Sequence, residues 1–329
     1  MSPVAHVAIH PSQFPEQVRR DLLESLRTRQ VNHKFHYDSI KQTQKWLALH
    51  QAYSPSRTDT DCAETYDASF KEAAMRVRAS AVHVVGLGCG GGQKDTRLLQ
   101  LLQQKGKRVS YTPSDVSTAM VLVARTAALA GGLAASECHP LVCDLATAED
   151  LEEVLAEQTQ PGVARLITFF GMIPNFEPDV ILPRLAGLVR PKDYLLFSAN
   201  LAPAADYAAG VQHILPLYDN GLTRDWLMTF LLDLGVEQRD GVLRFVIEND
   251  PAGSELKRVA GYFHFLQPRR IDVEADGFEF KAGEAIRLFF SYRHTPERVR
   301  TLLGAHGLNV LDQWITKSQE EGVFLCQQK

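Results

Sequence analysis

Residues 82–92 read VHVVGLGCGGG. The first six residues form a short, mostly apolar and β-branched run, which is typical of a strand buried on both faces. The glycines that follow allow positive φ and a close approach of the backbone to a ligand. A helix expected over 94–104 would point its unpaired N–H groups at the same place. The stretch therefore predicts a strand, a ligand-binding turn and a helix, although nicotinamide enzymes and plain turns carry similar glycines.

Beyond this stretch the chain alternates between strand-like and helix-like segments. Helical spacing of apolar residues indicates helices over 118–130 and 147–157. The expected strands cover 109–112, 139–142, 165–170 and 194–199. This alternation predicts a parallel, doubly wound α/β sheet with helices on both faces.

The segment 204–292 breaks the alternation. A helix expected over 221–234 is followed by segments at 241–247, 259–265 and 278–292 that are typical of antiparallel strands. These segments would suit a second, smaller α+β lobe that binds substrate. Residues 32–60 are rich in aromatic side chains and could form lid or pocket walls.

The two flanks of the chain complete the expected architecture. Helices are expected over 15–29 and 63–78 near the N-terminus, and over 295–306 near the C-terminus. Two strands at 310–314 and 322–326 would add an antiparallel hairpin to the parallel sheet, which distinguishes the Rossmann-like sheet of class I methyltransferases from that of dehydrogenases. We expect a cofactor-binding domain of residues 60–203 and 292–329, and a substrate-binding lobe of residues 1–59 and 204–291.

Composition excludes several classes of partner. The 329 residues include 45% hydrophobic and 22% charged residues and carry a formal net charge of −4, which offers no basic surface for nucleic acid or an anionic membrane. No signal peptide and no membrane-spanning run of about 20 apolar residues is apparent. The five scattered cysteines suggest a reduced compartment, and Cys138, His139 and Cys143 lack a second ligand pair for zinc. We expect a cytoplasmic, metal-free monomer or homodimer that acts on a small molecule.

Candidate cofactor-binding residues lie at the ends of the expected strands. Asp115 could accept hydrogen bonds from a ribose diol, a device that nicotinamide sites share. Asp144, followed by Leu145, stands where S-adenosyl-L-methionine (SAM) sites place the partner of the adenine amino group, but it could instead cap the next helix. Lys94 could approach the methionine carboxylate or be solvated, and Cys89 is interpreted as a small turn residue.

Five stretches, in register over nearly the whole chain, resemble the histidine Nα-methyltransferases of ergothioneine biosynthesis and the fungal enzymes that N-methylate dimethylallyltryptophan. KFHYD resembles the family's K-W-F-Y-D, YSPSRT resembles Y-Y-P-T-R-T, and FGMIPNF resembles F-L-G-x-T-I-G-N-L/F. The glycine turn through Lys94 is similar to the family's G-S-G-x-x-x-K, and SYR to its S-Y/C-K. These stretches are residues 34–38, 53–58, 88–94, 170–176 and 291–293.

The resemblance implies SAM as the cofactor and assigns roles to individual residues. Asn175 would bind the substrate α-amino group, Tyr53 its carboxylate, and Tyr37 would lie near the methyl-accepting nitrogen. Asn175 could instead be a turn residue, and the tyrosines half-buried core aromatics. Ser291 would bind the far end of the substrate. The remaining expected cofactor contacts are Gly88, Gly90, Phe170 and Gly171.

Three departures from the family pattern bear on the substrate. The stretch between Gly171 and Asn175 is one residue shorter and has Pro174 in place of a glycine. Phe289 stands where the histidine enzymes carry a glutamate that binds imidazole, and Gly261 where they carry a methionine. A phenyl ring offers area and stacking instead of charge. The departures predict a roomier, more apolar pocket for an aromatic or apolar amino acid rather than free histidine.

Two alternatives remain at this point. A NAD(P)-dependent oxidoreductase could use the same glycine turn, although a third glycine packing helix on strand is missing. A non-catalytic methyltransferase-like binding protein would be compatible with the altered stretch 170–176.

Overall fold

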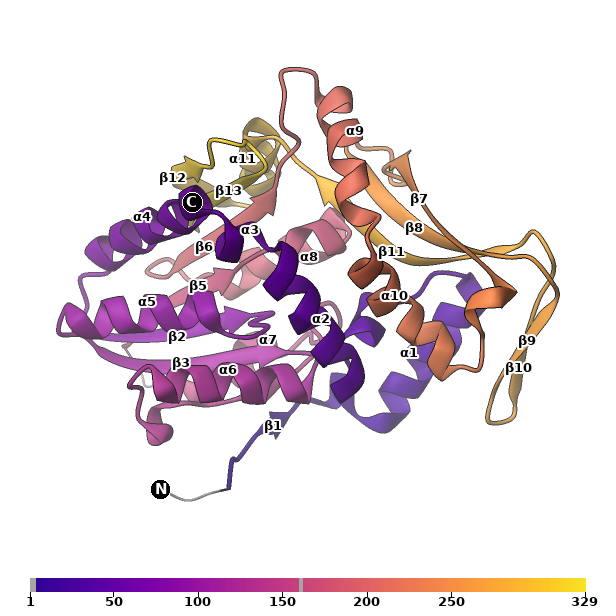
Figure 1. Cartoon of the computed structure of the whole chain (residues 1–329). Helices are drawn as coiled ribbons and strands as arrows, with labels where there is room; N and C mark the ends of the chain where they lie inside the picture. The colour runs from indigo at the N-terminus through magenta and orange to yellow at the C-terminus, as the bar shows by residue number, and fades with distance from the viewer. Residues whose placement is uncertain (1–3, 160–161) are drawn as a thin grey trace.

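The computed structural model describes residues 4–159 and 162–329, and an eight-stranded sheet forms its largest layer (Figure 1). Neighbouring strands pair in parallel except β13, which pairs antiparallel with both β6 and β12. The strands, in spatial order, are β1 (Ala8–Ile9), β4 (Leu141–Val142), β3 (Arg108–Asp115), β2 (Ala81–Leu87), β5 (Ala164–Phe169), β6 (Tyr194–Asn200), β13 (Glu321–Gln328) and β12 (Leu308–Ile315). The predicted α/β fold class and its closing hairpin are confirmed.

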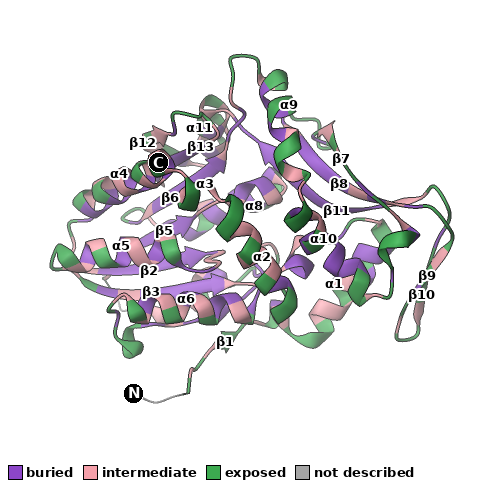
Figure 2. Ribbon diagram, in the orientation of Figure 1, coloured by how far each residue is buried: buried purple, intermediate pink, exposed green. Residues whose placement is uncertain are grey.

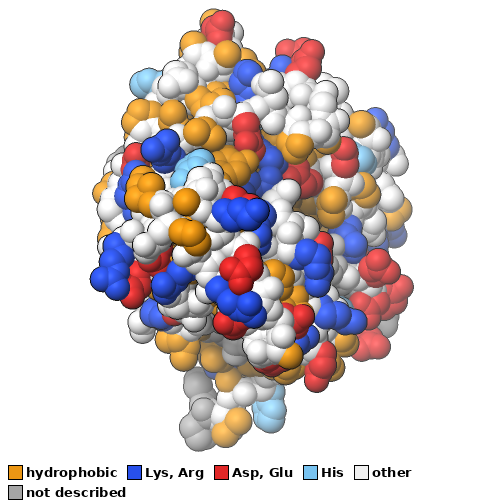
Figure 3. All heavy atoms as spheres, turned by 90° about the vertical axis from the view of Figure 1, so that its right-hand side faces the viewer, with side chains coloured by type: hydrophobic (Ala, Val, Ile, Leu, Met, Phe, Trp, Pro, Cys, Tyr) orange, Lys and Arg blue, Asp and Glu red, His pale blue; other side chains and the backbone are white. Residues whose placement is uncertain are grey.

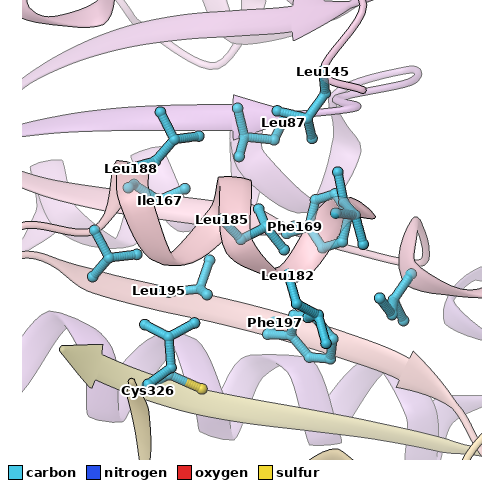
Figure 4. Packing of buried hydrophobic residues seen from close by; sticks show 14 of the residues in the cluster. Leu87, Leu145, Ile167, Phe169, Leu182, Leu185, Leu188, Leu195, Phe197 and Cys326 are labelled. Carbon is cyan, nitrogen blue, oxygen red and sulfur yellow. The ribbon is translucent and has the colours of Figure 1, made fainter. Parts of the chain in front are cut away.

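Helices cover both faces of this sheet because successive residues of its strands alternate between two apolar clusters. Leu166 and Leu196 pack with α4, α5 and α6, whereas their neighbours Ile167 and Leu195 pack with α7, α8 and α11. Figure 4 shows Leu182 and Leu185 of α8 lying against Ile167 and the strands beside it. The helices are α4 (Thr60–Arg76), α5 (Gln93–Gln104), α6 (Thr118–Ala130), α7 (Leu151–Gln158), α8 (Pro178–Leu188) and α11 (Pro296–Ala305).

A second, antiparallel sheet forms beside the first, with the strand order β11-β8-β7. A two-stranded hairpin of β9 and β10 extends from it (Figure 1). The strands are β7 (Gly241–Asn249), β8 (Lys257–Phe265), β9 (Arg269–Val273), β10 (Asp276–Phe280) and β11 (Ala285–Arg293). The accompanying helices are α1 (Pro15–Thr28), α9 (Tyr207–Tyr218) and α10 (Gly221–Asp233).

The aromatic-rich N-terminal segment connects the two sheets. Its 3₁₀ turn η2 (His33–His36) leads into α2 (Ile40–Tyr53), which begins with a capping box between Ser39 and Gln42 and is followed by α3 (Pro55–Thr58). Helix α2 contacts both α10 and α6. Because β1 also pairs with β4, the N-terminal residues contribute to the large sheet, whereas the proposed division into two lobes assigned residues 1–59 to the smaller lobe.

Burial follows these layers (Figure 2). The central strands β2, β5 and β6 are buried along most of their length, whereas β7 has a single buried residue, Leu243, and is otherwise half-buried or exposed. On the face that Figure 3 shows, acidic and basic side chains are interspersed. Among the described residues, no helix has the length and apolar character needed to span a bilayer.

Three sequence-based expectations about elements are wrong. Residues 278–292 are two strands rather than one, because residues 281–284, with Gly283 at φ +88°, interrupt the strand between β10 and β11. The helix expected over 147–157 begins at Leu151, since residues 144–148 form a turn instead. The strand expected at 139–142 contains only Leu141 and Val142. Strand β9 and helices α2, α8 and α9 were not predicted.

Candidate functional site

A cavity of about 1060 Å³ lies between the carboxyl ends of the parallel strands and the second lobe. All the predicted site residues except Ser291 and Gly261 line it. They are Tyr37, Tyr53, Gly88, Gly90, Lys94, Asp115, Asp144, Leu145, Phe170, Gly171, Asn175 and Phe289. The carboxyl edge of a parallel sheet is the usual place for a ligand in such folds.

The glycine turn after β2 has the geometry that its sequence predicts. Gly88, Gly90 and Gly92 adopt φ of +62°, +51° and +72°, a region that L side chains rarely occupy. A Cβ at Gly88 would lie 2.5 Å from the Met172 sulfur, so any other residue there would also displace that side chain. Helix α5 begins at the turn without a side-chain cap, which leaves N–H groups available to a ligand.

Asp115 closes the turn from the neighbouring strand. Its Oδ2 accepts a hydrogen bond from the Gly90 N–H at 3.1 Å, and its Oδ1 accepts one from the Ser117 N–H at 3.0 Å. Burial raises the pKa of the Asp115 carboxyl to about 6, against the lowering effect of these backbone N–H groups. The carboxylate has lone pairs left for a ligand hydroxyl.

One carboxylate oxygen of Asp144 has no hydrogen-bond donor among the described residues. Its Oδ1 accepts a hydrogen bond from the Ala146 N–H at 2.9 Å, whereas its buried Oδ2 has no hydrogen-bond partner among the described residues. The alternative that Asp144 caps a helix is wrong, because α7 begins at Leu151; the carboxylate caps the turn before it. An orphaned buried acceptor beside a glycine turn fits a cofactor that brings an N–H donor.

Lys34 was quoted only as part of a motif, yet its buried ammonium approaches Asp144. The Lys34 Nζ lies 3.5 Å from Asp144 Oδ2, is hydrogen-bonded to Asp21 of α1, and donates to Gln13 at 3.1 Å. This lysine therefore links the N-terminal segment to the loop after β4. A sequence signal existed, because the lysine begins the KFHYD stretch.

Lys94 is held by the wall of the cavity. Its Nζ donates to the Tyr66 hydroxyl at 2.7 Å and lies 3.6 Å from Glu321. The Tyr66 hydroxyl also contacts Ser198, whose Oγ accepts the Gly171 N–H at 2.8 Å. The expected role at the methionine carboxylate stays a prediction, but the lysine is not simply solvated.

The shortened stretch after β5 forms one tight turn. Gly171 adopts φ +69°, and the 3₁₀ turn η4 (Ile173–Asn175) follows, in which the Asn175 N–H donates to the Met172 carbonyl at 3.0 Å. The Asn175 side chain donates from Nδ2 to the Phe290 carbonyl on β11 at 2.6 Å. This bond orients the amide and leaves Oδ1 as an acceptor at the cavity.

Aromatic rings from α2, α9, α10 and β11, together with Tyr37 at the end of η2, form the wall opposite the turn. Tyr37 lies 5.5 Å from Trp226 and 6.0 Å from Trp46 between ring centroids. Phe289 lies 6.0 Å from Trp226 and 5.7 Å from Tyr218. Burial, and secondarily the charge of Asp115, raises the pKa of the Tyr37 hydroxyl, so Tyr37 stays protonated at neutral pH. Trp226 and Tyr218 were not predicted as site residues.

Three predicted substrate-binding residues lie less centrally. Tyr53 ends α2 at the rim and is 54% exposed. Ser291 does not line the cavity, and its hydroxyl is hydrogen-bonded to the Tyr218 hydroxyl at 2.7 Å. Gly261 pairs with Phe289 across the β-sheet, but the Phe245 ring lies 3.1 Å from where its Cβ would be, so the ring covers it. The structure therefore offers no direct cavity contact for Ser291 or Gly261.

Two buried arginines that sequence reasoning missed also line the cavity, at the two ends of β11. Arg287 donates to Gln30 Oε1 at 2.8 Å. Arg293 donates to the Tyr218 hydroxyl at 2.7 Å and to the Leu201 carbonyl at 3.3 Å. Neither has a carboxylate within 4 Å among the described residues.

The hairpin-closed parallel sheet, the glycine turn, and the acidic residues after β3 and β4 together define a class I SAM-dependent methyltransferase. The comparison with known families is more specific. The chain belongs to the family described as histidine-specific, SAM-dependent methyltransferase, which matches residues 17–238 and 241–328. The resemblance stated above and SAM as the cofactor are thereby confirmed, and the oxidoreductase and non-catalytic alternatives are set aside.

Relatives span most of the chain. N-methyltransferase imqF of Aspergillus flavus is 27% identical over 282 residues, which cover 83% of this chain and 73% of the relative. Histidine N-alpha-methyltransferase of Mycobacterium tuberculosis is 27% identical over 330 residues, 94% of each protein. Among solved structures, magnesium protoporphyrin IX methyltransferase of Synechocystis with bound SAH has a TM-score of 0.48 and 12% identity, covering 88% of this chain and 95% of that chain.

Proposed function

We propose that this N-methyltransferase transfers methyl groups to the amino nitrogen of an amino acid, or a derivative of one, with an aromatic or apolar side chain. The observation that carries the proposal is the Asn175 amide. Its Nδ2 is engaged by the Phe290 carbonyl at 2.6 Å, so its Oδ1 is the atom available to a ligand N–H in the cavity.

The chemistry requires a neutral amine held in line with the methyl donor. Bound SAM supplies a methyl group on a positively charged sulfur. An ammonium has no lone pair and must first lose its proton to water. A cavity walled by buried aromatic rings disfavours the charged form of the amine and so favours the reactive one. Asn175 Oδ1 would accept an amine N–H and direct the lone pair toward the methyl group.

Tyr37 and Tyr53 would complete the amino-acid site. The protonated Tyr37 hydroxyl can donate or accept a hydrogen bond near the nitrogen, but its raised pKa argues against a role as a base. Tyr53 at the rim would contact the substrate carboxylate after a modest movement of its side chain. Ser291 would act through the Tyr218 hydroxyl rather than by direct contact.

The side-chain preference rests on Phe289. This residue is buried against Trp226, Tyr218 and the His33 ring, so an aromatic substrate would meet aromatic edges and faces instead of a carboxylate. The relatives include a histidine Nα-methyltransferase and an N-methyltransferase, which supports an amino-acid-like acceptor without identifying it.

The test is a screen of amino acids and small amines with isotopically labelled SAM, read by mass spectrometry. We expect label in N-methylated aromatic or apolar amino acids and little in histidine. Label found only in histidine, or only on oxygen or carbon atoms, would contradict the proposal.

A further inference from the structure

Arg287 is a buried charge that lines the cavity and has no carboxylate within 4 Å among the described residues. Its side chain is on β11, its exposed fraction is 9%, and its only hydrogen bond among the described residues goes to the neutral Gln30 side chain at 2.8 Å. The Phe290 ring covers one face of the guanidinium at 4.9 Å. Gln30 Oε1 thus engages one N–H group of this guanidinium among the described residues, and the other N–H groups are available to water or a ligand.

His33 adds a second unpaired donor. Its Nε2 accepts a hydrogen bond from the Phe290 N–H at 3.4 Å, so the ring proton belongs on Nδ1. Nδ1 is buried and has no hydrogen-bond partner among the described residues. Burial lowers the pKa of His33 well below its ordinary value, with smaller contributions from His36, Arg287 and Arg258, so the ring is neutral at pH 7. His33 also lines the cavity.

The charged groups that act on Arg287 are Arg258, Glu177 and Glu248. Arg258 donates to Glu177 at 2.9 Å and to Glu248 at 2.7 Å, and it does not line the cavity. Tyr262 donates to the second oxygen of Glu248 at 2.8 Å. The two glutamates balance the two arginines in number, but among the described residues their oxygens bond to Arg258 and to tyrosines, and neither carboxylate forms an ion pair with Arg287.

We propose that Arg287 and His33 form an anion subsite that binds a carboxylate of the substrate. The inference rests on the proposed function, because it concerns a part of the same acceptor. A carboxylate would accept hydrogen bonds from the guanidinium and from His33 Nδ1, and would form the direct ion pair that Arg287 lacks among the described residues. The carboxylate is either the α-carboxylate of the amino acid or an acidic group on its side chain.

Three probes distinguish these sources when titrated calorimetrically into the full-length protein saturated with S-adenosylhomocysteine. The probes are L-phenylalanine, 2-phenylethylamine, which lacks the α-carboxylate, and 4-carboxy-L-phenylalanine, which adds a distal one. An α-carboxylate subsite predicts that phenylalanine binds at least about tenfold more tightly than phenylethylamine, a factor equal to about 1.4 kcal/mol. A distal subsite predicts the same factor for 4-carboxy-L-phenylalanine over phenylalanine.

Variants then assign the preference to its residues. Arg287→Gln should remove the tenfold preference, Arg287→Lys should keep part of it, and His33→Phe, which keeps a ring between Phe289 and Phe290, should reduce it. A thermal shift with S-adenosylhomocysteine equal to that of the unaltered protein verifies that each variant is folded.

The proposal is overturned if no carboxylate probe binds, if neither preference is present, or if the preference survives Arg287→Gln. A preference abolished by Arg293→Gln but not by Arg287→Gln would overturn it as well. Its failure is distinguishable from failure of the proposed function, because N-methylation of phenylethylamine can be measured without any carboxylate.

Discussion

At the scale of single residues, the Asn175 amide is the clearest candidate for a group that aligns the acceptor. We expect Asn175→Ala to lower kcat by about 100-fold, because loss of the oriented acceptor misplaces the nitrogen. The affinity for S-adenosylhomocysteine should stay unchanged. Steady-state kinetics and calorimetry measure the two quantities. Asn309→Ala, at an exposed asparagine on β12, is the matched control. Normal turnover combined with lost cofactor binding would contradict the assigned role.

Phe289 tests the side-chain preference. We expect Phe289→Glu to increase the kcat/KM for histidine relative to phenylalanine, because a carboxylate can accept a hydrogen bond from imidazole. Burial among Trp226 and Tyr218 will raise the pKa of the new carboxyl, so the gain should grow with pH. Phe289→Gln, which is polar but uncharged, is the control. No gain for histidine at any pH from 6 to 9 would remove Phe289 from the specificity argument.

Asp115 predicts a pH dependence of cofactor binding. Burial raises the pKa of its carboxyl from 3.8 to about 6, so the group gains a proton as the pH falls through about 6. Protonation removes an acceptor lone pair that a ribose hydroxyl would use. We expect the affinity for S-adenosylhomocysteine to fall by about tenfold per pH unit below 6 and to be constant above 7. Titrations of Asp115→Asn should be flat over this range; an equal slope in that variant would refute the assignment.

Site residues whose positions follow from the local sequence could be predicted, whereas residues that meet only in the tertiary structure could not. Asp115 and Asp144 follow strands, and Gly88 and Gly90 require positive φ, so the strand-turn-helix pattern located them. Arg287, His33 and Trp226 were missed because they meet only in the tertiary structure, from segments about 190 to 250 residues apart in the chain. Ser291 was proposed from the family resemblance of the SYR stretch, but its hydroxyl is bonded to the Tyr218 hydroxyl.

At the scale of elements, the buried Lys34 connects three of them: η2, α1 and the loop after β4. We expect Lys34→Met to lower the free energy of unfolding by about 3 kcal/mol, because it leaves Asp21 and the buried Asp144 without their cation. Lys41→Met is the matched control. Lys41 pairs with Asp233 at an exposed site, so its loss should cost less than about 1 kcal/mol. Denaturant unfolding measures both, and equal losses would contradict the coupling.

Elements with strong periodicity were the ones that the sequence predicted well. Helix α1 occupies Pro15–Thr28, close to the expected 15–29, because its apolar residues recur at helical spacing. The single strand expected at 278–292 was wrong because alternation continues on both sides of a four-residue interruption, which only Gly283 marked. Helix α2 was missed because its aromatic and polar residues serve a cavity wall and show weak periodicity.

At the scale of the whole molecule, the parallel sheet and its closing hairpin could be predicted because βα alternation restricts the topology to few choices. The smaller lobe could be recognised only as a region in which the alternation of strands and helices stops. No comparable topological rule fixes the boundaries of this lobe in the sequence. Strand β1 illustrates the difficulty, because two residues from the N-terminal segment join the edge of the large sheet.

The position of β13 has a consequence for how this protein matures. The strand lies between β6 and β12, and Glu321 at its start contacts Tyr66 and lies 3.6 Å from Lys94 at the glycine turn. While the chain is being translated, β12 emerges first but has no neighbour to join, and the wall beside Lys94 is incomplete. The ribosome must therefore release residues beyond 320 before the methyl-donor site can assemble, so a nascent chain arrested earlier should fail to retain S-adenosylhomocysteine.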